Sequence, residues 1–257
     1  MKFEDYKDDI IYGFSTRNGG VSTGVYESMN LSLTLPDDPK KVRRNYELWS
    51  ESLGVDVHRI VIGQQTHTNN VVRVDEHNCG EGVFKDRMPD VDGLVTNVPG
   101  VALVTHHADC TPVYLYDPKH HAIGMVHAGW RGTVQEIARV AVEKMMAEFG
   151  SNPEDMVAMI GPCISKEHFE CDRDVVDAIE AMSVEAMEFV DYDEDAKKYH
   201  VSIADVNRRV LEVTGIPADH IDMQNRCTYS NPELYFSHRR DGLNRGGHSA
   251  LLMLREE

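Results

Sequence analysis

Three side chains with an affinity for transition metals stand in separate short segments of this sequence. They are His67 in GQQTHTNNVV, Cys110 in HHADCTPV and His127 in GMVHAGWRGT. Each segment lies at the end of an expected strand, where a sheet can bring together groups that are distant along the chain. Two imidazoles and a thiolate suit Zn²⁺, and three protein ligands leave a fourth tetrahedral position open, as in catalytic zinc sites. The segments lie much farther apart than the ligands of a zinc finger, so buried histidines and a buried thiol remain an alternative.

The chain turns after His127, through residues 128–132, into an expected helix, and this turn is a candidate anion site. Unpaired backbone N–H groups at a helix start attract negative charge, and Arg131 would add a guanidinium group. The alternative is that Trp130 packs in the core while Arg131 pairs with a surface acid. Arg131 is therefore a candidate for binding an anionic substrate.

Two further segments carry groups that could contact a ligand. Residues 15–31, STRNGGVSTGVYESMNL, combine Arg17 and Asn30 with glycines and hydroxyl residues, as in a loop that closes over a ligand. The same glycines also suit an ordinary turn and connector, because glycine readily adopts positive φ. The segment from His238 to Arg245 is a second local concentration of positive charge. We take Arg17 and Asn30 as candidates for binding the substrate.

The helices and strands that must position these residues are predicted from the spacing of hydrophobic residues and from residues that typically start or end such elements. Asp38, Pro39 and Gly54 predict a helix over residues 39–53. Thr133 and Glu136 form a capping box, which predicts the start of the apolar stripe over residues 134–149. Two more helices are predicted at 174–186 and 203–214, and Ser202 and Gly215 mark the start and the end of the second. Strands are predicted at 71–74, 93–96, 101–106, 112–116, 122–126 and 156–160. Many strands with few helices indicate an α+β or mixed α/β fold with central mixed sheets and flanking helices.

Composition excludes several classes of protein. Of the 257 residues, 41% are hydrophobic and 27% charged, which is typical of globular domains and not of disordered or disulfide-rich chains. The 43 acidic and 26 basic residues leave a net charge of −17, which repels nucleic acids. Apolar runs are far shorter than the roughly 20 residues that span a bilayer. The acidic start MKFEDYKDDI lacks the features of an export signal, so we expect a cytoplasmic protein without membrane contact.

Several motifs together resemble those of the YfiH-type, or laccase-domain, family. They run in the expected order over nearly the whole chain: GFSTRNGGVS, GQQTHTNNVVRV, DGLVTN, ADCTPVYLYD, HAGWRGTV, GPCIS and YFSHRRD. The resemblance implies one compact domain over residues 1–257, related to cysteine-hydrolase-like folds. It also implies that His67, Cys110 and His127 ligate a metal ion. Residues 243–248 depart from the T-G-R pattern of many relatives, which leaves the role of Arg245 open.

The family has been labelled both polyphenol oxidase, or laccase, and purine nucleoside phosphorylase, with adenosine deamination and methylthioadenosine phosphorolysis also attributed to it. A multicopper oxidase needs a mononuclear and a trinuclear copper centre, and the sequence has no His-x-His element of the kind that such clusters typically use. We therefore expect a zinc-dependent phosphorylase acting on adenosine, inosine and methylthioadenosine, with adenosine deaminase side activity. Purine nucleosides and phosphate would be its partners, and the sequence does not determine an oligomeric state.

Under this interpretation the candidate catalytic residues are Cys110, His127 and Arg131. The candidates for binding substrate and phosphate are Arg17, Asn30 and, again, Arg131. Copper remains possible at a single Cys-His-His site, because it binds more tightly than zinc in the divalent series. Alternatives are a copper-dependent polyphenol oxidase, a thiol hydrolase in which Cys110 attacks with His127 as base, and a pure binding module. Asp109 is either the general acid or a group that orients an imidazole.

Overall fold

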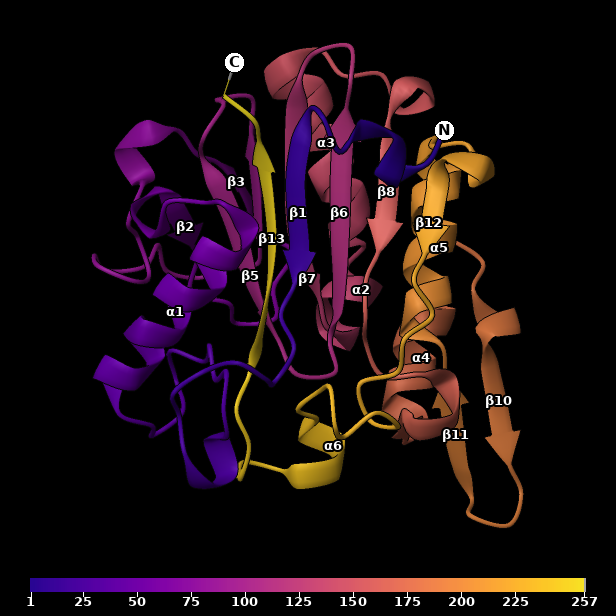
Figure 1. The fold of residues 1–257 in the computed structure, drawn as a ribbon. Coiled ribbons are helices and arrows are strands. Elements are labelled where there is room, and N and C mark those ends of the chain that lie inside the picture. Colours follow the sequence, from indigo (N-terminus) through magenta and orange to yellow (C-terminus); the bar gives the residue numbers. More distant parts are fainter. Residues whose placement is uncertain (257) are drawn as a thin grey trace.

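Two sheets pack face to face at the centre of the molecule, and helices cover their outer faces (Figure 1). The computed structural model describes residues 1–256. The layers follow the order helix α1 (Pro39–Leu53), a four-stranded sheet, a six-stranded sheet, and helices α3 (Ile137–Phe149) and α5 (Ile203–Thr214). This arrangement confirms the predicted mixed class of central sheets and flanking helices.

Both central sheets contain parallel and antiparallel strand pairs. The four-stranded sheet has the order β1 (Ile10–Phe14), β13 (His248–Leu254), β5 (Ala102–His107) and β2 (Ile60–Ile62). The six-stranded sheet has the order β12 (Ile221–Met223), β8 (Val157–Ile160), β6 (Thr111–Asp117), β7 (Ala122–Ala128), β4 (Gly93–Thr96) and β3 (Val71–Arg73). A small third sheet orders β10 (Val190–Asp193), β11 (Lys198–Val201) and β9 (Glu170–Cys171).

The core divides according to the alternation of side chains along each strand. In β13, Leu252 packs between the two sheets, whereas its neighbours Leu251 and Met253 pack in the cluster that contains Tyr46 and Trp49 of α1. Successive strand residues point to opposite faces, so a strand buried on both faces must be apolar throughout. This explains the unbroken apolar run Ala250–Leu254 within β13.

Helices α1 and α5 begin and end at the residues that the sequence predicts. Asp38 accepts a hydrogen bond from the backbone N–H of Lys40 at the start of α1, and Ser202 accepts one from Asp205 N at the start of α5. Gly54 and Gly215 follow these helices with φ of 70° and 111°, a left-handed conformation that glycine adopts without steric cost. These predictions are confirmed because each depends only on residues close in sequence.

The predicted capping box at Thr133 and Glu136 is wrong. Thr133 lies inside a separate short helix, α2 (Trp130–Val134), and its hydroxyl accepts a hydrogen bond from Asn207 of α5. Glu136 has φ of 55° between α2 and α3, and its carboxylate accepts hydrogen bonds from Ser183. Both side chains are engaged by distant segments, and the chain breaks between them into two helices.

The remaining helices are short. Helix α4 (Arg173–Glu180) ends earlier than the predicted residue 186, and α6 (His238–Asp241) is one turn in the segment that Figure 1 places below the strands. The sequence did not predict strands β1, β2, β12 and β13, or those of the third sheet. Among residues 1–256, no helix combines the length and apolar character needed to cross a bilayer.

Candidate functional site

His67, Cys110 and His127 come together at one end of the six-stranded sheet. His67 lies in the loop between β2 and β3, Cys110 directly precedes β6, and His127 lies in β7. Strands β6 and β7 pair antiparallel with Pro112 opposite His127, which brings Cys110 to the same end as that histidine. One ligand atom from each residue lies within 4.8 Å of the others. This spacing and this donor set fit one tetrahedral Zn²⁺ with an open position.

The carboxylate of Asp92 organises this group. It is fully buried (0% exposed) and accepts hydrogen bonds from the backbone N–H groups of Thr66, His67 and Thr68 at 2.9 to 3.1 Å. It also accepts from the Thr68 hydroxyl at 3.0 Å and from His127 Nδ1 at 2.9 Å. Because Nδ1 then carries the proton, Nε2 of His127 is free as a metal ligand. The same carboxylate holds His67 in a left-handed conformation, with φ of 65°.

Charge coupling makes a thiolate available at this site. Burial alone would raise the pKa of Cys110, but His127 and His67 outweigh it and lower the pKa to about 6. Burial opposes the charged form of His127 as well, yet Cys110 and Asp92 raise the pKa of His127 to about 9. Without a metal ion, the pair is therefore a thiolate and an imidazolium at neutral pH, and the thiolate is the form of cysteine that binds metals or attacks carbon.

Three further histidines surround the site but serve the fold. His106, His107 and His248 belong to β5 and β13, and burial lowers the pKa of each far below its ordinary value. The ring nitrogens of His106 lie within hydrogen-bond distance of Tyr46 and Ser249. Those of His107 lie near the Thr105 hydroxyl and the Cys110 carbonyl. Those of His248 lie near the Ser15 hydroxyl and the Phe236 N–H. In residues 1–256, His67, Cys110 and His127 form the only cluster of three potential ligands of this kind. The described chain thus offers one metal centre and not several.

A cavity of about 300 Å³ opens beside the three residues, and we call it the aromatic cavity. His67 and Cys110 line this cavity. Its lining also includes Trp130, Arg131, Ile164, Phe169, Ile203, His238 and Arg239. Two guanidinium groups lie over aromatic rings here, that of Arg131 at 4.2 Å from the Trp130 ring centroid and that of Arg239 at 5.3 Å from the Phe169 ring centroid. A flat, apolar group with polar edges would suit such a lining.

A second cavity of about 310 Å³ meets the first at His67, Ala108, Cys110 and His238. We call it the arginine cavity. Its remaining lining includes His127 and two arginines, Arg87 and Arg245, together with Ser32, Thr34, Gln65, His106, His107 and Gly247. Two of the three potential metal ligands, His67 and Cys110, therefore line both cavities, and the third, His127, lines the arginine cavity.

Arg17 and Asn30 line neither cavity. Arg17 donates to the carbonyls of Glu27 and Pro232 and lies 4.6 Å from the ring centroid of Phe236. Asn30 is fully buried and accepts from the N–H groups of Ser32 and Gly247. Both residues tie the segment 15–31 to the C-terminal part of the chain, so the site described here does not include them.

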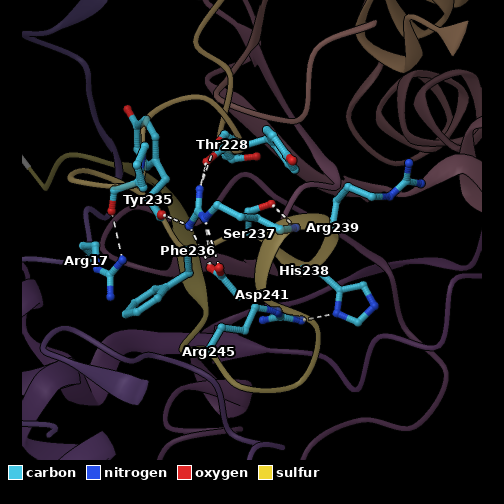
Figure 2. Close-up of polar contacts among 12 residues, drawn as sticks. Arg17, Thr228, Tyr235, Phe236, Ser237, His238, Arg239, Asp241 and Arg245 are labelled. Carbon is cyan, nitrogen blue, oxygen red and sulfur yellow. Dashed lines mark hydrogen bonds and ion pairs between the residues drawn. The ribbon is translucent and has the colours of Figure 1, made fainter. Parts of the chain in front are cut away.

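Asp109 holds a loop and orients no imidazole. Its carboxylate accepts hydrogen bonds from the Thr228 hydroxyl at 2.6 Å, the Ser237 hydroxyl at 3.0 Å and the Arg239 N–H at 2.7 Å. These contacts fix the segment that carries His238 and Arg239, both of which line the aromatic cavity. Figure 2 shows this segment. The orienting function considered for Asp109 belongs to Asp92.

Sequence reasoning missed Asp92, Arg87, Phe169 and Ile203 as site residues. For Asp92 a signal was present, because an acid directly before the buried strand Gly93–Thr96 needs hydrogen-bond donors at that end of the sheet. For the others the sequence offers no comparable signal, since their only common property is the cavity wall that the fold creates.

Gly129 makes room for the metal-ligand group, which gives a first testable prediction. A Cβ at this position would lie 2.9 Å from Cδ2 of His67 and 3.1 Å from Sγ of Cys110. We expect Gly129→Ala to weaken zinc affinity by about 10-fold or more, because ligand geometry must be held closely. Competition with a zinc chelator measures the change. Gly54→Ala is the control: its φ of 70° makes the variant strained, but it lies far from the site and should keep wild-type zinc affinity.

Comparisons with known proteins show the family of this chain. A sequence model of the family described as multi-copper polyphenol oxidoreductase laccase matches residues 11–255. The chain is 37% identical over 235 residues to "Purine nucleoside phosphorylase YlmD" of Bacillus subtilis, covering 91% of this chain and 84% of that protein. It is 32% identical over 239 residues to "Adenosine deaminase RL5" from an unknown prokaryotic organism, covering 92% and 91%. The crystal structure of the Bacillus licheniformis hypothetical protein YfiH has a TM-score of 0.95 at 32% identity, covering 98% of this chain and 95% of that one. The chain therefore belongs to the multi-copper polyphenol oxidoreductase laccase family, the YfiH-type family that its motifs resemble.

Proposed function

We propose that this protein is a zinc-dependent purine nucleoside phosphorylase that acts on adenosine, inosine and methylthioadenosine, with adenosine deaminase side activity. The observation that carries the proposal is the close grouping of His67, Cys110 and His127 beside the aromatic cavity, which His67 and Cys110 line. The names of the two related proteins support the same two activities.

His67, Cys110 and His127 would hold the zinc ion. When bound, the ion supplies a positive charge that polarises a substrate oxygen or nitrogen, or lowers the pKa of water. Asp92 supports this set by keeping the proton on His127 Nδ1 and by holding the backbone of His67.

The aromatic cavity supplies the binding surface for the nucleoside. Trp130 and Phe169 offer faces against which a purine can stack, and Ile164 and Ile203 exclude water from its edges. Arg131 lines the same cavity, and its contact with substrate or phosphate stays a prediction. In phosphorolysis an oxygen of hydrogen phosphate bonds to C1′ of the sugar as the C1′–N9 bond breaks. The bonding electrons pass to the purine, which takes up the proton that phosphate loses.

The coupled Cys110 and His127 pair supports a second candidate, a thiol hydrolase in the metal-free protein. His127 lowers the pKa of Cys110, and its own raised pKa suits proton transfer to a leaving group. Zinc analysis separates the candidates, because a thiolate bound to zinc is not a free nucleophile. The copper-oxidase alternative is less favoured, since one three-ligand cluster in residues 1–256 does not match a mononuclear plus a trinuclear centre.

Product analysis tests the proposed function. Protein loaded with zinc as its only metal should convert inosine and adenosine in phosphate buffer to free base and pentose 1-phosphate. Without phosphate, the sugar phosphate should disappear, while conversion of adenosine to inosine should persist. Absence of all these products, together with oxidation of a phenol by copper-loaded protein, would reverse the proposal in favour of the oxidase.

A further inference from the structure

We propose that the arginine cavity is the binding site for inorganic phosphate, with Arg87 and Arg245 as its cationic ligands. The inference rests on the proposed phosphorylase function and names the site of its second substrate. It differs from the expectation for Arg17 and Asn30, whose polar groups are used within the fold.

Neither arginine has a carboxylate partner, and no acidic residue of the described chain lines this cavity. There are 43 acidic residues for 26 basic ones, yet within residues 1–256 no carboxylate lies within ion-pair distance of Arg87 or Arg245. The acids of the adjoining loop are engaged elsewhere, because Asp109 binds Ser237 and Thr228 and Asp241 pairs with Arg240. Two cations kept free on one cavity wall predict an anionic ligand.

Arg245 in particular lacks acceptors. Its Nη1 donates to the carbonyl of Gly246 at 2.8 Å, but its buried Nε has no hydrogen-bond partner in the described chain. Its Nη2 lies 3.4 Å from His238 Nδ1. Figure 2 draws this contact as a dashed line. That nitrogen also lies 3.1 Å from the carbonyl of Gly242. A carbonyl only accepts, so in that contact Nδ1 carries the proton and cannot also accept from Arg245. A partly buried guanidinium with donors to spare matches the oxygens of phosphate.

The position of the cavity suits the reaction. The aromatic and arginine cavities share His67, Cys110 and His238, so a nucleoside in the first and phosphate in the second would meet at the metal-ligand group. The hydroxyls of Ser32 and Thr34 line the arginine cavity and can donate to further phosphate oxygens. Holding both substrates against each other contributes to the rate by removing the entropy cost of their encounter.

Steady-state kinetics of zinc-loaded variants test the site. We expect Arg245→Gln and Arg87→Gln each to raise the KM for phosphate by about 10-fold or more, while the KM for inosine stays within about 2-fold. Arg245→Lys should recover part of the phosphate affinity, because it restores the charge without the planar fork. Arg43→Gln is the matched control, since Arg43 lies over the ring of Phe84 outside the cavity, and should leave both constants unchanged. Unchanged phosphate KM in both cavity variants, or an equal rise in both KM values, would overturn the inference.

Direct binding separates this inference from the proposed function. Calorimetry with inorganic phosphate as the titrant should show binding to the zinc-loaded wild type and loss of binding in Arg245→Gln and Arg87→Gln. This result would support the phosphate site even if no nucleoside were converted, which would refute the phosphorylase function alone. Phosphate binding of equal strength in the wild type and both variants, or no binding in any, would refute the site.

Discussion

Cys110→Ala should abolish zinc binding and nucleoside turnover while leaving the fold intact. Cys110 supplies the only thiolate among the three ligands, and two imidazoles alone rarely hold zinc tightly. We expect zinc content to fall to about one tenth of the wild-type level or lower and kcat to fall by about 100-fold or more. Metal analysis, product formation and circular dichroism measure the three quantities.

A matched control for Cys110→Ala is Cys163→Ala. Burial raises the pKa of Cys163 to about 12, so this nearby thiol stays protonated and cannot act as a thiolate ligand. Its variant should keep zinc and turnover, with a modest loss of stability from the small cavity that it leaves. Full turnover by Cys110→Ala would rule out a direct function for that thiolate in catalysis.

Asp92→Asn should damage stability and metal affinity together. The carboxylate accepts from three backbone N–H groups, one hydroxyl and one imidazole without access to water, and an amide would present its own donors to some of them. We expect a loss of about 3 kcal/mol in the free energy of unfolding and a 10- to 100-fold weaker affinity for zinc. Urea denaturation and chelator competition measure these changes.

The pH dependence of stability provides a second readout for Asp92. Burial alone would raise the pKa of this carboxyl, but His127 and the N–H groups of Thr68 and Thr66 lower it to about 2. A folded-state pKa below the ordinary value near 4 means that the carboxylate stabilises the fold above pH 4, and that this contribution is lost as the pH falls from about 4 to about 2. Asp92→Asn should lack that part of the acid transition.

Asp117→Asn is the control for Asp92→Asn. Asp117 is also fully buried and lies 2.8 Å from a histidine Nδ1, that of His120, but it stands at the opposite end of β6. Asp117→Asn should lower the free energy of unfolding without changing zinc affinity. An equal loss of zinc affinity in the two variants would show that Asp92 affects zinc binding only through the general stability of the fold.

The elements that sequence reasoning placed well depend on neighbouring residues. Helix α1 and helix α5 begin and end at the predicted positions, because each is set by a cap and a following glycine. The capping box at Thr133 failed because Asn207 engages its hydroxyl and Ser183 engages the carboxylate of Glu136. Strand β13 was not predicted because its run of five apolar residues, Ala250–Leu254, shows no alternation of apolar and polar residues. Only the two layers packed on its faces require that run.

By themselves the residue types indicated a thiol and two imidazoles suited to zinc, and the motifs indicated the family that contains them. The tertiary structure decided which carboxylate holds His127, which aromatic residues share a cavity with Cys110, and which arginines line the neighbouring cavity. The physical reason is that ligand chemistry belongs to each side chain, whereas the pairing of Asp92 with His127 and the cavities around Cys110 depend on strand register and on loops anchored across the fold. Those long-range contacts leave no local pattern in the sequence.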